Sequence, residues 1–142
     1  MCNLTENLSM HSFTGYKVVY KLVWNYYSIA TGIKYEIGKL LPESKKITPI
    51  SIGNYFKSNI LNEDSEWFSP EMSGRTCVFR SFFNASRMKD DILAFLEEYG
   101  EKKPHGSFKV VKVTLEIDLM AGLYPLTEEV VAGRMITKIV EI

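Results

Sequence analysis

Cysteine and histidine are scarce in this sequence, which has two of each among 142 residues. Cys2 and Cys77 do not form the dense pattern of a secreted disulfide framework, and Cys77 lies in an apolar run that favours a buried thiol. The spacings of metal-binding motifs, such as C-x-x-C and H-E-x-x-H, do not occur, and neither do the glycine motifs that bind phosphate. The sequence therefore predicts no metal site and no cofactor.

An excess of charge of one sign is also missing. Seventeen Lys and Arg residues balance seventeen Asp and Glu residues, so the net charge is zero. Proteins that bind nucleic acids usually have a basic excess, because neutralising phosphates drives their affinity. A nucleic-acid partner is therefore not expected. Neutral copies of one chain repel each other little, so the composition allows a homo-oligomer.

Long apolar runs are absent, although 46% of the residues are hydrophobic. No stretch approaches the roughly 18 apolar residues of a membrane-spanning helix. The first residues lack the basic and apolar regions of a signal peptide. We therefore expect a cytoplasmic globular protein with no membrane partner.

Alternation of apolar and polar residues predicts several β-strands with one buried face. Polar residues 1–14 are expected to form a flexible lead-in to a single domain at 15–142. A long loop or insertion is expected at 42–75, which is rich in Pro, Gly, Ser and Asn. The expected strands are 16–23, 26–29, 34–37, 76–80, 108–119 and 135–142, of which the first three would form an antiparallel meander.

One long amphipathic helix is predicted from Phe82 to Tyr99, between a capping Ser81 and a terminating Gly100. Asp90 and Asp91 could mark a break in it. The fold class is therefore α+β, with a mostly antiparallel sheet of about five or six strands and this helix on one face. Apolar residues recur at three- and four-residue steps and form the stripe that would contact the sheet: Ala85, Met88, Ile92, Phe95, Leu96 and Tyr99.

Aromatic residues supply the candidate binding site, since the chain has eight Tyr, eight Phe and two Trp. On a small sheet under a long loop they could line a pocket with arginine at its rim, or they could simply form the core of the meander. Exposed aromatic residues beside arginine would also suit a protein–protein contact. The candidate ligand-binding residues are Tyr27, Tyr35, Trp67, Arg75 and Arg80.

Glu128 and Glu129 are the candidate catalytic residues, because they come just before the last predicted strand, where a carboxylate could project from a strand edge. With Tyr27 or Tyr35 they would suit a nucleotide- or NAD-utilising enzyme of ADP-ribosyltransferase-like fold, which combines a stacking aromatic residue with a late glutamate. Such enzymes have Arg or His on the first strand, whereas residues 16–23 contain only lysines as basic residues.

Three functional hypotheses follow from these patterns. The first is a non-enzymatic binding or interaction domain whose partner is a protein or a small ligand. The alternatives are the NAD- or nucleotide-utilising enzyme and a domain that binds single-stranded nucleic acid by stacking bases on sheet aromatics. The neutral charge argues against the last.

The chain resembles small uncharacterised α+β domains of bacteriophages, giant viruses and microbes. The resemblance rests on the opening segments Gly15–Val19, Tyr26–Ser28 and Tyr35–Lys39, and on later segments at Val78–Arg80 and Val110–Val113. It covers most of residues 15–142 except 42–75. Because most members have no known function, it implies no catalytic residue, and it implies at most an accessory or host-interaction role for a viral or mobile-element protein.

Overall fold

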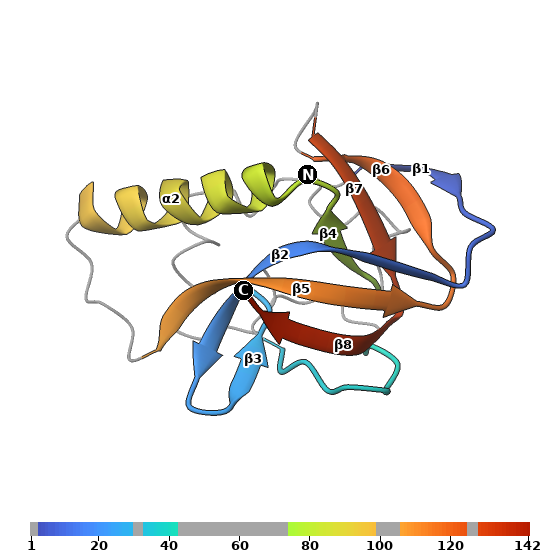
Figure 1. Ribbon diagram of the computed structural model, residues 1–142, viewed down its shortest axis with the longest axis horizontal. Helices are drawn as coiled ribbons and strands as arrows, with labels where there is room; N and C mark the ends of the chain where they lie inside the picture. Colours follow the sequence, from blue (N-terminus) through green and yellow to red (C-terminus); the bar gives the residue numbers. More distant parts are fainter. Residues whose placement is uncertain (1–2, 30–32, 43–73, 99–105, 125–127) are drawn as a thin grey trace.

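The computed structural model describes residues 3–29, 33–42, 74–98, 106–124 and 128–142. Within these ranges one helix, α2, lies against one antiparallel sheet, which confirms the α+β prediction (Figure 1). The sheet has eight strands, so the expected number of five or six is wrong. The elements are β1 (Asn3–Asn7), β2 (Ser12–Leu22), β3 (Asn25–Tyr27), β4 (Thr76–Phe79), α2 (Phe82–Glu98), β5 (Ser107–Glu116), β6 (Met120–Tyr124), β7 (Glu128–Gly133) and β8 (Met135–Glu141).

The sheet curves strongly on itself. Its strand order is β1-β6-β7-β4-β2-β5-β8, with β3 pairing separately to β2. Strands β7 and β8 follow each other with only Arg134 between them, yet β7 pairs with β4 and β6 while β8 pairs with β5. Two consecutive strands can occupy such different places only where the chain turns a sharp corner (Figure 1).

That corner is held by contacts between the β5–β6 turn and Arg134. Ile117 and Asp118 have φ values of 69° and 50°, in the left-handed region. The backbone N–H of Arg134 donates to the Ile117 carbonyl at 3.0 Å, and its Nε donates to Asp118 Oδ2 at 3.0 Å. The strand expected over 108–119 therefore ends early, as β5 at Glu116, because the chain reverses at Ile117 and Asp118 despite continuing apolar alternation. The strand β6, which starts at Met120, was not predicted.

Replacing Ile117 with glycine should stabilise the protein by about 1 kcal/mol, because a β-branched residue at positive φ is strained. The Ile117 side chain is 41% exposed and belongs to neither of the two buried clusters, so its removal leaves both cores intact. Urea unfolding of Ile117→Gly beside the parent protein would measure the gain. A lower unfolding midpoint would show that the contacts of this side chain outweigh the backbone strain.

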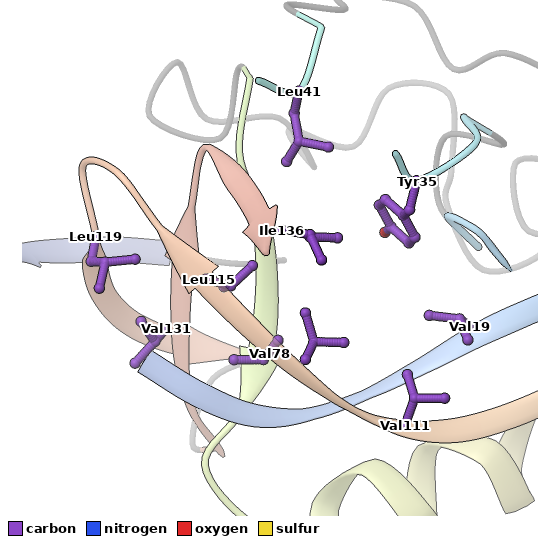
Figure 2. Packing of buried hydrophobic residues seen from close by; sticks show 10 residues of the cluster. Val19, Tyr35, Leu41, Val78, Val111, Leu115, Leu119, Val131 and Ile136 are labelled. Atoms are coloured by element: carbon purple, nitrogen blue, oxygen red, sulfur yellow. The ribbon is translucent and has the colours of Figure 1, made fainter. Parts of the chain in front are cut away.

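Buried side chains gather on both faces of the sheet. The face toward α2 buries a cluster that includes Val18, Tyr20, Phe79 and Phe108. On the other, concave face, Val19, Val111 and Leu115 have no exposed surface and Ile136 has almost none. Figure 2 shows Tyr35 and Leu41 beside Ile136, covering this second cluster on the side away from β2. Alternation along β2 and β5 thus fills two cores rather than one dry and one wet face.

Two expectations for the first 41 residues are wrong. Residues expected to form a flexible lead-in include β1, which pairs with β6, and the start of β2. The polar composition of β1 suits an edge strand that buries little besides Leu4. The third strand of the meander does not form: residues 34–37 contribute one isolated bridge between Lys34 and Tyr27, and the chain then crosses toward β8.

Helix α2 agrees with its predicted position and runs without a break at Asp90–Asp91. Ala85 and Ile92 are buried against the sheet and Met88 packs beside them, as the stripe predicts. The side chains of Phe95, Leu96 and Tyr99 lie outside the described part of the structure. Among the described residues, no helix has the length and apolar composition that crossing a bilayer requires.

The end of β8 is tied to β2 by an ion pair between Lys21 Nζ and Glu141 Oε1 at 3.0 Å. The hydrogen bond to Glu141, aided by its charge, raises the pKa of Lys21 above the ordinary value of 10.5. A lysine whose pKa is higher in the folded state contributes stability below the unfolded pKa and loses it as pH rises through the folded pKa.

The urea midpoints of the parent protein and of Glu141→Gln should therefore differ by a constant amount at neutral pH. The difference should shrink as pH rises beyond 10.5, where Lys21 loses its proton. Unfolding curves at several pH values would measure it. Thr137→Ser is a suitable control on the same strand, because it adds and removes no charge. A difference that stays constant into the alkaline range would contradict this assignment.

Candidate interaction surface

Two phenylalanines stand out at the start of α2. Phe82 and Phe83 occupy the first turn of the helix, and their side chains are 46% and 68% exposed. Because successive residues of a helix are about 100° apart, Phe83 lies nearly opposite Ala85, which faces the sheet. The same periodicity that buries Ala85 and Ile92 therefore places Phe83 on the outer side of the helix.

The ring of Phe82 continues this aromatic surface toward the sheet. It meets the Tyr16 ring edge-on, with 5.6 Å between ring centroids. Lys112 Nζ, from the neighbouring β5, lies 5.9 Å from the centroid of the same tyrosine ring. These contacts connect the first turn of α2 with β2 and β5 and hold the ring of Phe82 in place.

Two Arg–Glu ion pairs lie near the start of α2, and one of them contacts Phe83. Arg87 pairs with Glu128, and its guanidinium carbon lies 6.0 Å from the Phe83 ring centroid. Arg80 Nε lies 3.8 Å from Glu129 Oε2, and its guanidinium carbon is 5.0 Å from the Phe13 ring centroid. Phe13 packs with the concave cluster, so Arg80 and Glu129 lie on the face of the sheet away from α2. We call Phe82, Phe83 and Arg87 the Phe82–Phe83 surface.

Pairing of β4 with β7 brings the arginines and glutamates together. Val130 lies opposite Phe79 in this ladder, and the backbone N–H of Arg80 donates to the Glu129 carbonyl at 3.2 Å. Glu128 and Glu129 therefore lie within β7, an interior strand of the sheet. We expected them to project from a strand edge before the last strand, and this expectation is wrong. The sequence did not predict β7, because the strand begins with two acidic residues, which are uncommon in strands.

Glu128 is held between the sheet and α2. One carboxylate oxygen pairs with Arg87, while the other, Oε2, is buried and has no hydrogen-bond partner in the described structure. Only 13% of the side chain is exposed. A carboxylate held in this way has little access to a substrate, and Arg87 compensates its charge.

The candidate tyrosines do not share a pocket. Tyr35 is buried in the concave cluster, and its hydroxyl is hydrogen-bonded to Thr76 Oγ1 at 3.0 Å. Tyr27 packs against the cluster on the opposite face, beneath α2, and pairs with Tyr20. Both tyrosines are thus used in the two cores, which is the alternative that the sequence left open.

The remaining candidates are also separated. Arg75 Nε donates to the Asp118 carbonyl at 3.1 Å, at the corner of the sheet. Trp67 lies outside the described residues. Of the candidate residues, Arg80 and Glu129 meet, whereas β3, which carries Tyr27, and β7, which carries the glutamates, lie at opposite ends of the fold (Figure 1). These residues do not form the predicted arrangement of a stacking tyrosine beside a late glutamate.

Sequence reasoning missed Phe82, Phe83, Arg87 and Phe13. The signal for Phe83 was present, because it lies outside the apolar stripe of the helix and so had to be exposed or to contact another element. Nothing in the sequence pairs Phe13 with Arg80, since their contact follows from the position of β4 beside β2.

Within the residues described, His, Cys, Asp and Glu side chains do not gather in groups of three that could hold an ion. Comparisons with protein-family models, curated proteins and solved structures found no match to this chain.

Proposed function

We propose that this protein is a non-enzymatic binding domain and that it binds a protein partner through the Phe82–Phe83 surface. The observation that carries the proposal is the exposure of two adjacent phenylalanines, 46% and 68%, on a rigid helix beside arginine. Aromatic residues and arginine are enriched at the centres of protein interfaces, where burying a ring contributes much of the affinity.

The shape of this surface favours a protein over a small molecule. Small ligands bind in concave sites that bury most of their area. Phe83 lies on the outer, convex side of α2, so a small molecule would contact it on one side only. A partner protein can instead supply a complementary groove that removes both rings from water.

The positions of the other candidate residues support a binding role. Arg87 holds Glu128 and Arg80 lies beside Glu129, so both acids contact arginine side chains. Stacking of nucleic-acid bases needs exposed rings on the sheet. Tyr20 is buried, and Tyr16 and Tyr27 are half-buried against the cluster beneath α2. These tyrosines therefore offer little free area for a base.

Photo-crosslinking in cells would identify the partner. A photoreactive amino acid at position 83 should yield a discrete protein adduct, whereas the same residue at position 140 should not. Val140 is a matched control because it is also an exposed apolar residue, 42% accessible, but lies on β8. Equal adducts from both positions would contradict the proposal.

The double variant Phe82→Ala, Phe83→Ala should then bind the crosslinked partner at least about tenfold more weakly, because two interface rings are lost. Val140→Ala should bind as the parent does. Both affinities can be measured by calorimetry with the purified partner. Turnover of NAD or a nucleotide by the purified protein, abolished in Glu129→Gln, would overturn the non-enzymatic role.

A further inference from the structure

The turn between β2 and β3 exposes two large apolar residues. Leu22 pairs with Asn25, so the turn consists of Val23 and Trp24 alone. Trp24 is 85% exposed and Val23 is 72% exposed, more than any other large apolar side chain in the described structure. Figure 1 shows this hairpin projecting from the body of the fold, far from β7.

The residues of this turn conflict with its backbone. Two-residue hairpin turns favour Gly, Asn or Asp, because their first residue often takes a positive φ. Val23 has a φ of 58°, which is rare and strained for a β-branched side chain. The backbone strain at Val23 lowers the stability of the fold, and the exposed Trp24 side chain contributes little burial to offset it. Conflicts of this kind between sequence and structure occur mainly at functional sites.

The base of the hairpin is aromatic and basic. Tyr26 pairs with Lys21, whose amine lies 5.8 Å from the Tyr26 ring centroid. Lys34 forms an isolated backbone β-bridge with Tyr27. Lys109 pairs across the sheet with Val19, which is four residues before Val23. These lysines lie within roughly 13 Å of the turn along the strands. Segments 12–29 and 106–115 contain no Asp or Glu. Glu141 is paired with Lys21, and Glu36, which follows Lys34 by two residues, is paired with Lys39.

We propose that the Val23–Trp24 turn is a peripheral membrane anchor that inserts into the interface of an anionic bilayer. Indole and phenol rings favour the headgroup level, where an apolar ring and a polar edge are both satisfied. Lys34 and Lys109, behind the apolar turn, would then meet negatively charged headgroups, while Lys21 stays paired with Glu141. A protruding turn needs no preformed groove in a bilayer, because lipids move aside. The expectation of no membrane partner rests on the lack of a spanning segment, which a peripheral contact does not need.

Vesicle binding tests this anchor directly. The full chain carrying Trp67→Phe retains Trp24 as its single tryptophan. Its fluorescence should shift to the blue with vesicles of phosphatidylcholine containing about 30% phosphatidylserine, and binding should weaken severalfold with phosphatidylcholine alone or in high salt. Trp24→Ala should reduce the vesicle-bound fraction of the parent chain at least about tenfold, as measured by cosedimentation.

Phe83→Ala is the matched control, because it removes another exposed ring from the Phe82–Phe83 surface and should leave vesicle binding unchanged. Equal loss in both variants would indicate nonspecific adsorption and would overturn the anchor. Lack of binding to either vesicle would overturn it too, and crosslinking of a protein at position 24 would then identify the turn as a protein contact. Neither failure affects the partner test at position 83, so the two proposals are separable.

Discussion

A Gly15→Ala variant is expected to lose about 2–3 kcal/mol of unfolding free energy, because its new methyl group has no room. A Cβ at Gly15 would lie 2.6 Å from the Phe79 carbonyl oxygen and 2.6 Å from Val78 Cγ2. The first contact is with backbone, so a side-chain rotation does not relieve it. The strands β2 and β4 would have to separate where Tyr16 pairs with Phe79.

Gly38→Ala separates this steric effect from the general cost of removing glycine. Gly38 has a φ of 76°, but a Cβ there would meet nothing within 4 Å. Its replacement should therefore cost only about 1 kcal/mol, through backbone strain. Urea unfolding of the two variants should preserve the slope and move the midpoint much further for Gly15→Ala. Equal shifts would contradict the close approach of β2 and β4.

Leu115→Ala should lose about 3 kcal/mol, because it leaves a cavity in the concave core. Leu115 has no exposed surface and belongs to the same cluster as Ile136 and Val131. This cluster lies inside the curve of the sheet (Figure 2), where rigid strands limit collapse around the missing atoms. The measurement is again the free energy of unfolding in urea.

Leu123→Ala provides the same chemical change at a surface. Leu123 lies on β6 and is 40% exposed, so its truncation should cost less than about 1 kcal/mol. Similar losses for both leucines would show that the concave face does not form a closed core in solution. Such a result would also show that the Tyr35 ring is not packed in this cluster in solution.

The helix and β4 could be predicted because their signals are local. The stripe from Ala85 to Ile92 fixes the face that contacts the sheet, and the apolar run at Thr76–Phe79 makes a buried strand. The corner at Ile117 could not be predicted, because neither Ile nor Asp at these positions breaks the alternation of β5. Its cause is tertiary: the hydrogen bonds from Arg134.

The candidate site was predictable only in part, because its residues come from distant segments. Arg80 and Glu129 were both proposed from the sequence, but their proximity depends on the β4–β7 ladder. Tyr35 was proposed for a pocket, yet its ring is needed to fill the concave cluster. The exposed Val23–Trp24 turn could not be predicted from residue preferences, because two-residue turns favour Gly, Asn or Asp and this one contains two large apolar residues.

The long β2–β5 ladder also determines how the chain reaches this structure. Thr14 and Thr114 face each other across it although they are 100 positions apart, and the ladder extends from Ser12–Glu116 to Lys21–Ser107. Closing so large a loop loses chain entropy before any contact compensates for it. Folding should therefore be slow, in milliseconds to seconds. During synthesis, β2 is therefore made long before β5, the strand with which it forms this ladder.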